Sequence, residues 1–351
     1  MRHWPLLSIF FLALLFACGN DDEGFDNPNN EPPIDLDNFY DIVIQNEFTT
    51  PPAKVSVFFR VEDVNGDPVA DLTQDQFSIF EKGRNDDEFK PISVDEADRV
   101  VSDNENVFRY NVMMLLDLSA SVTNNHLNEV KAAASQFVHS TLGNDQNTST
   151  RIGIFWFDGA DNLHVLKDFT NIINELDEAI DDIQANMSSD NSTDLYGAVI
   201  KGTQITNARI QQDELVAFQS AGAMLIFTDG TDQAARYSRE EAFASVDSFS
   251  SKINFYTVGL GNEIDEDVLE RLGEKEAVLA ANADELDENF NMISELIYKE
   301  INSFYLFEYC TPKRDGSGIN ELQIRLDFDD KAGSRETEFD ATGFRSGCTL
   351  N

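Results

Sequence analysis

The sequence is poor in positive charge: 25 Lys and Arg stand against 65 Asp and Glu, a formal net charge of −40 at pH 7. Nucleic-acid binding needs a basic surface that displaces counterions from phosphates, so this imbalance excludes nucleic acid as a partner. It also excludes docking on anionic lipid through polybasic contacts. Hydrophobic residues still make up 41% of the 351 residues, which is enough to build folded cores. A chain of this length typically forms about two domains.

Cysteine is scarce, and no CxxC or Cys/His cluster exists that would hold zinc or perform redox chemistry. The three cysteines are Cys18, Cys310 and Cys348. Since two cysteines of an exported protein commonly pair, we expect a structural disulfide between Cys310 and Cys348.

Long apolar runs are lacking except at the start of the chain, where residues 1–17 read MRHWPLLSIFFLALLFA. This run is shorter than the roughly 20 residues that span a bilayer, and it predicts a signal peptide. Cys18 follows Leu15-Phe16-Ala17, which resembles the lipobox of bacterial lipoproteins and implies a lipidated Cys18 as the first mature residue. Ordinary signal-peptidase cleavage is the alternative.

Residues 18–40 are rich in Asp, Asn, Glu and Pro and predict a disordered tether. The cluster Asp21, Asp22, Glu23 resembles the surface-export signal of Bacteroidetes-type lipoproteins, although a solvated linker explains it equally well. Together these resemblances imply a lipid-anchored protein of the bacterial outer membrane, exposed at the cell surface and touching the membrane only through its anchor.

The segments 41–108 and 303–351 alternate apolar and polar residues, as in KVSVFFRV from Lys54 and ELQIRLDF from Glu321. This period of two predicts half-buried strands. Domain termini commonly lie close together, so we expect the two segments to form the N-terminal and C-terminal parts of one β-sandwich. Two small independent β modules are the alternative.

Residues 109–302 change period, with continuous apolar runs such as NVMMLLD (Asn111–Asp117) alternating with helical spacing. Strands that alternate with helices predict an α/β domain: a doubly wound, mostly parallel, Rossmann-like sheet covered on both faces. We expect this domain to be inserted into, or flanked by, the β-sandwich.

Polar residues follow three predicted elements of this domain. Asp117, Ser119 and Ser121 form a DxSxS motif after the first strand, Thr193 lies in a loop before a helix, and Asp229 ends the fourth strand in TDG. Because ligands bind outside the carboxyl ends of strands in such sheets, the three loops should converge there. Their hydroxyl and carboxylate oxygens predict a site for a hard cation. The Thr193 hydroxyl is expected to be exposed.

DxSxS, STDLYGA and TDG, in this order, resemble the metal-ion-dependent adhesion site (MIDAS) of the von Willebrand factor type A (vWA) domain. The resemblance covers about residues 110–302 and includes VGLGNEIDEDVLERL (Val258–Leu272). It implies that Ser119 and Ser121 coordinate the metal, that Thr193 does so directly or through water, and that Asp117 and Asp229 act mainly through water or from behind the ligands. A divalent cation is implied, with Mg²⁺ favoured and Mn²⁺ or Ca²⁺ as alternatives.

The resemblance implies a non-enzymatic module that binds a protein ligand presenting an acidic residue, in adhesion or in assembly of an envelope complex. We assign no catalytic residue and no organic cofactor. The alternatives are an envelope hydrolase that uses the bound metal, and a vWA scaffold whose metal is purely structural. FDGADN, with Asp158 and Asp161, lacks the spacing of a calcium loop and is interpreted as an acidic turn.

Overall fold

The computed structural model of the chain describes residues 39–92, 100–101, 108–143, 149–188, 190, 192–216, 219–282, 285–314 and 318–350. The predicted signal peptide (1–17), Cys18 and the tether up to residue 38 lie outside these ranges. No helix in the described ranges is long and apolar enough to cross a membrane.

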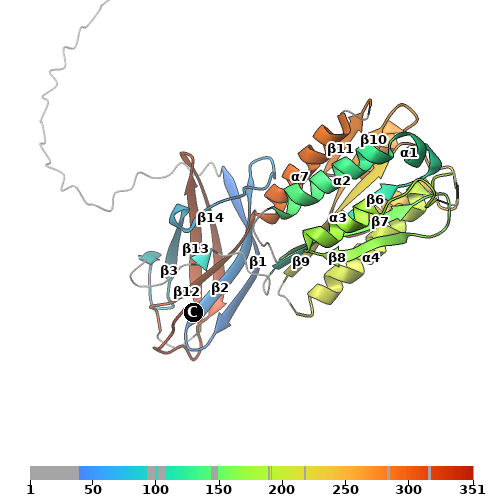
Figure 1. Cartoon of the computed structure of the whole chain (residues 1–351). Helices are drawn as coiled ribbons and strands as arrows, with labels where there is room; N and C mark the ends of the chain where they lie inside the picture. The colour runs from blue at the N-terminus through green and yellow to red at the C-terminus, as the bar shows by residue number, and fades with distance from the viewer. Residues whose placement is uncertain are drawn as a thin grey trace, which may run out of the picture. The chain divides into compact units, whose positions relative to one another are not determined.

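The centre of the chain forms a six-stranded sheet within the described residues (Figure 1). In sheet order its strands are β11 (Glu276–Ala280), β10 (Ile253–Leu260), β9 (Gln219–Thr228), β6 (Phe108–Asp117), β7 (Thr150–Phe157) and β8 (His164–Thr170). Neighbouring strands pair in parallel except β7 and β8, which are antiparallel. This mixed, mostly parallel sheet confirms the predicted α/β fold class.

Helices cover both faces of the sheet. Successive residues of a strand point to opposite sides, and in the central strands both sets of side chains are apolar. The helices are α1 (Ala120–Asn125), α2 (Leu127–Leu142), α3 (Ile173–Asp181), α4 (Leu195–Asp213), α5 (Arg239–Phe249), α6 (Glu266–Leu272) and α7 (Leu286–Ile301). From β6, Val112, Met114 and Leu116 enter one core with α2, α3 and α7. Met113 and Leu115 enter a second core with α4, α5 and α6. The continuous apolar run of this strand therefore reflects burial on both faces.

Two antiparallel sheets are built by the flanking segments. One contains, in order, β1 (Tyr40–Thr50), β2 (Lys54–Asp63), β12 (Phe304–Cys310) and β5 (Val100–Val101); the other contains β14 (Lys331–Asp340), β13 (Ile319–Phe328), β3 (Phe77–Lys82) and β4 (Lys90–Ile92). A short 3-10 helix, η1 (Gln74–Gln76), precedes β3. In the first sheet Phe59 pairs with Tyr305, and in the second Ile79 pairs with Ile324. Strands from before and after the α/β domain thus share both sheets and one apolar core.

The edge strands β1 and β14 have little apolar periodicity, and the sequence pattern does not predict either. In β1 the ladder with β2 is irregular between Ile44 and Asn46, which breaks the alternation halfway along the strand. β14 reads KAGSRETEFD and buries few side chains. Tyr40, expected at the end of the tether, is instead a buried residue of β1.

The structure contains the Cys310–Cys348 disulfide, with a Cα–Cα distance of 5.7 Å. It joins the last residue of β12 to the segment that follows β14. Chain-entropy arguments assign a loop of this length about 4 kcal/mol of stabilisation.

Glu81 of β3 is a fully buried carboxylate inside the sandwich. Its oxygens accept hydrogen bonds from Thr311 Oγ1 (2.7 Å) and Asn320 Nδ2 (3.1 Å). Burial raises the pKa of Glu81 to about 7, because these donors only partly compensate for the loss of water. A raised pKa means that the folded state prefers the protonated acid, so this site favours folding at low pH and opposes it as the pH rises through 7.

Glu81→Gln should therefore abolish part of the pH dependence of stability. The amide is neutral at every pH, and the unpartnered Asn320 Oδ1 is available to accept its N–H. Urea unfolding should give similar stabilities for both proteins at pH 4, below the ordinary pKa of Glu, and a variant more stable by about 3 kcal/mol at pH 8. Profiles that run parallel from pH 4 to pH 8 would show that Glu81 is not protonated in the folded protein.

Candidate metal centre

The parallel pairing of β6 with β9 determines where the candidate residues meet. Leu116 of β6 lies opposite Phe227 of β9, so the residues after both strands emerge at the same edge of the sheet. This is the edge at which open α/β sheets bind ligands. The DxSxS and TDG motifs are therefore brought together, as their positions in the sequence predict.

The first loop is folded around Asp117, the last residue of β6. Asp117 Oδ1 accepts a hydrogen bond from Ser119 N (2.9 Å), and both residues are fully buried. Ser119 immediately precedes α1, which begins at Ala120. Ser119 Oγ lies 3.2 Å from Ser121 Oγ in the first turn of this helix. The turn thus places two hydroxyls next to one carboxylate.

Two hydrogen bonds connect this loop with the end of β9. Thr228 Oγ1 donates to Asp117 Oδ2 (2.7 Å), and Ser121 Oγ donates to Asp229 Oδ1 (2.9 Å). Asp117, Ser119, Ser121 and Asp229 therefore form one hydrogen-bonded group, which we call the DSSD group.

Thr193 reaches the same region from a separate loop. Its carbonyl oxygen accepts hydrogen bonds from Gln233 N (2.8 Å) and Ala234 N (3.1 Å), in the loop that follows β9. The Thr193 side chain is 3% exposed, which corrects the expectation of an exposed hydroxyl. No hydrogen bond among the described residues links this hydroxyl to the DSSD group, so Thr193 is attached to the region through its backbone.

The two carboxylates of the DSSD group form no ion pair with Lys or Arg among the described residues. Burial raises the pKa of Asp117 to about 6. Burial also raises the pKa of Asp229, and the hydrogen bond from Ser121 and the nearby His126 offset this rise only in part. Two partly desolvated carboxylates beside two hydroxyls are a donor set that fits a hard divalent cation, because the cation would supply the missing charge.

Asp158 contributes to the geometry in a way that the sequence pattern does not predict. It is buried after β7, and its carbonyl oxygen accepts a hydrogen bond from Asp194 N (2.9 Å), next to Thr193. Its carboxylate accepts Ser188 Oγ (2.8 Å) and Ala160 N (2.8 Å). Asp158 therefore fixes the loop that carries Thr193, whereas Asp161 is exposed and pairs with Lys201.

Asp232, which the sequence analysis does not identify, stabilises the loop after β9. Its carboxylate accepts Tyr196 N (3.2 Å), in the first turn of α4, and Ala235 N (3.0 Å). Ala235 adopts a positive φ of 50°, which a non-glycine residue seldom does. A second Asp three positions after Asp229 is the sequence signal that could have indicated this role.

An open α/β sheet with hydroxyls and carboxylates gathered at the carboxyl ends of its strands is typical of the α/β domains that bind ligands at this edge. The von Willebrand factor type A domain family matches residues 111–296, more than half of the chain. The chain therefore belongs to this family, which is known for metal-dependent protein binding at a MIDAS. None of the curated proteins matches the chain.

Several solved structures resemble this fold. One is proximal thread matrix protein 1 from the mussel byssus with a zinc-occupied MIDAS motif, at 13% identity and a TM-score of 0.44, covering 55% of this chain and 48% of that chain. A second is the vWF domain of the type V pilus tip protein Mfa5 from Porphyromonas gingivalis, at 13% identity and a TM-score of 0.44, covering 55% of this chain and 96% of that chain. A third is a von Willebrand factor type A protein from Catenulispora acidiphila, at 9% identity and a TM-score of 0.44, covering 88% of this chain and 74% of that chain. The match spans about half the length of the mussel protein.

Thr228→Val tests how strongly the DSSD group depends on its buried donor. The substitution keeps the shape of the side chain but leaves Asp117 Oδ2 and Gly230 N without their hydrogen bonds to Thr228 Oγ1, which should cost about 1–3 kcal/mol in the free energy of unfolding. The loss should be larger at pH 8 than at pH 5, because it weakens the support of the charged carboxylate. Urea unfolding of the metal-free protein measures it.

Thr206→Val is the matched control, because Thr206 is equally buried but donates only to Met113 Sδ at 3.7 Å. This variant should be less destabilised than Thr228→Val and should show no added pH dependence. Equal losses in the two variants would mean that the Thr228–Asp117 bond has no special weight.

Proposed function

We propose that this protein is a non-enzymatic, metal-dependent protein-binding module of the bacterial envelope, acting in adhesion or in assembly of an envelope complex. The observation that supports this function is the DSSD group itself: hydroxyls and partly desolvated carboxylates, with no Lys or Arg ion pair in the described ranges, at the ligand-binding edge of a vWA sheet. A bound cation would make this edge attractive to an anionic group of a partner.

The residues divide into two roles by their hydrogen bonds. Both oxygens of Asp117 are engaged, one by Ser119 N and one by Thr228 Oγ1. Asp117 is therefore suited to orient the loop and to hold water on the ion. The hydroxyls of Ser119, Ser121 and Thr193 are the proposed direct ligands, and Asp229 stands behind Ser121.

Neutral hydroxyl ligands leave the charge of the ion incompletely balanced, whereas direct carboxylates would balance it. The ion then retains attraction for one more anionic oxygen, which we propose is a carboxylate of the partner protein. This explains how a chain of net charge −40 would capture an acidic ligand: the nearby ion dominates the local field. Mg²⁺ is our preferred ion, since it accepts oxygen ligands and retains waters.

Calorimetric titration with Mg²⁺ and Mn²⁺ tests the assigned ligands. Asp229→Asn should lower metal affinity by about 10–100-fold, as is typical when the partner of a ligand is removed. Thr193→Val, which preserves the shape of this buried side chain, should also lower metal affinity, because it removes one of the proposed hydroxyl ligands. Glu270→Gln, an exposed position on α6, is the control and should leave affinity unchanged.

Capture of proteins from envelope extract, with and without chelator, then separates binding from a structural metal. Capture that survives chelation in a protein that binds metal normally would contradict the proposed role. Metal affinity unchanged in Asp229→Asn would contradict the proposed site.

We also propose that Cys18 is the lipidated first residue of the mature protein and that residues 18–38 tether the folded part to the outer membrane at the cell surface. Several acyl chains anchor stably where one binds only marginally. Mass spectrometry of the mature N-terminus should find cleavage before Cys18 and acyl chains on that residue. Cys18→Ser should release the protein from the membrane fraction; an unmodified Cys18 would contradict the proposal.

A further inference from the structure

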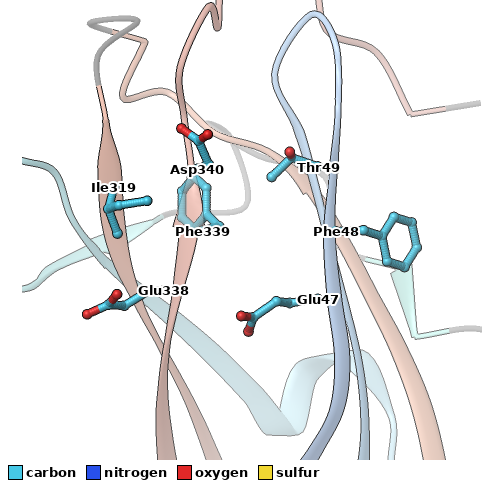
Figure 2. A pocket seen from close by; sticks show the side chains of 7 residues that line it. All are labelled: Glu47, Phe48, Thr49, Ile319, Glu338, Phe339 and Asp340. Carbon is cyan, nitrogen blue, oxygen red and sulfur yellow. The ribbon is translucent and has the colours of Figure 1, made fainter.

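A groove opens between the two sheets of the sandwich at the edge formed by β1 and β14. Each of these strands is the outermost in its sheet and is paired with one strand among the described residues; at the start of β14, Phe39 N also donates a hydrogen bond to Ala332 O (3.1 Å). The strands approach closely at one end, where a Cβ on Gly333 would lie 2.3 Å from the carbonyl oxygen of Tyr40. At the other end they enclose a cavity of about 390 Å³, which we call the β14 edge groove (Figure 2).

The inner side of this groove is polar although it adjoins the core. The irregularity after Ile44 places Glu47 opposite Val57 and Thr49 opposite Val55, two buried core residues. Glu47 and Thr49 therefore face the interior of the sandwich at its rim, and Figure 2 shows them directed toward the gap. The Glu47 carboxylate accepts a hydrogen bond from Thr337 on the opposite strand.

The outer side of the groove is formed by β14 and β13. Asp340 pairs with Ile319 and Glu338 pairs with Glu321 on the solvent-facing side of this sheet. Between them the Phe339 side chain turns inward and is 4% exposed. The outer edge of β14 thus runs between carboxylates on both sides: Glu47 on the inner side, and Glu338 and Asp340 on the outer side.

An edge strand directs alternate N–H and C=O groups away from its sheet, where an extended segment can bind them. Side chains of an added strand would alternate between the inner and outer sides of the groove. Side chains on the inner side would lie near Glu47, and those on the outer side would lie near Glu338 and Asp340. We propose that the β14 edge groove binds an extended basic segment of a partner protein as an additional strand beside β14.

The charge of the groove selects this occupant over two others. Residues 18–38 of the chain contain several Asp and Glu and no Lys or Arg, so the groove would repel them. A second copy of a chain with net charge −40 would also be repelled. A segment that alternates Lys or Arg with small or β-branched residues satisfies both the strand geometry and the charge.

The test uses a blocked ten-residue peptide that alternates Lys and Thr, with fluorescence anisotropy of the peptide on the mature protein as readout. The Lys-Thr peptide should bind and its Glu-Thr counterpart should not. A further Lys-Thr peptide carries an N-methyl group on every residue. Because neither edge of this peptide can then donate to β14, it should lose about tenfold or more in affinity although its charge is unchanged. Binding equal to that of the unmethylated peptide would indicate charge attraction without strand addition and would overturn the proposal.

The double variant Glu338→Gln/Asp340→Asn should weaken binding about two- to tenfold, in keeping with the modest strength of exposed ion pairs. The control Glu270→Gln/Glu274→Gln changes the net charge of the protein equally, at exposed positions in or next to α6, and should leave binding unchanged. Equal weakening in both variants would show that only total charge matters and would overturn the proposal.

Peptide binding should be unaffected by chelator and by Asp229→Asn, because the groove and the DSSD group belong to different sheets. Peptide binding that requires metal would overturn the assignment of the groove but would leave the proposed metal site unaffected. Self-association that the double variant abolishes would assign the groove to a second copy and would likewise overturn the proposal.

Discussion

The alignment of β6 with β9 is the constraint on which the candidate site depends. Parallel pairing forces the carboxyl ends of both strands to one edge, and the hydrogen bonds Thr228–Asp117 and Ser121–Asp229 then join the two loops. A shift of one residue in this register would turn the alternating side chains of β6 toward the wrong core and separate these pairs. The same burial that fixes the register also desolvates the carboxylates. Stability of the sheet and desolvation of the candidate site therefore have a common origin.

Support for the site comes from residues that would never contact an ion. Asp158 and Asp232 use backbone and side-chain acceptors to hold the loop before α4 against the ends of β7 and β9. Each satisfies N–H groups that loop backbone would otherwise leave unpaired. The position of Thr193 is set in this way, since its carbonyl oxygen, rather than its hydroxyl, makes the observed contacts with the loop after β9.

Sequence patterns predicted what strong periodicity and an ordered motif can predict. The apolar run of β6, doubly buried, indicated a parallel sheet, and DxSxS with TDG located the edge at which Asp117 and Asp229 meet. The polar edge strands β1 and β14 were not predicted. The pairing of β1 is irregular after Ile44, and β14 buries few residues, so neither has a regular apolar alternation. The burial of Thr193 was also not predicted, because it results from loops separated in the sequence. Local pattern cannot reveal packing between such loops.

The pairing of β2 with β12 also has a consequence for biosynthesis. Lys54 and Glu308 form a salt bridge although they are 254 positions apart, and the whole α/β domain lies between them in the chain. Strands made early must therefore wait for partners made last, while the central domain has all of its own strands and helices beforehand. Contacts of such long range fold slowly. The apolar faces of the first strands are therefore exposed longest during synthesis, and the sandwich core closes only when β12 and the strands after it have been made.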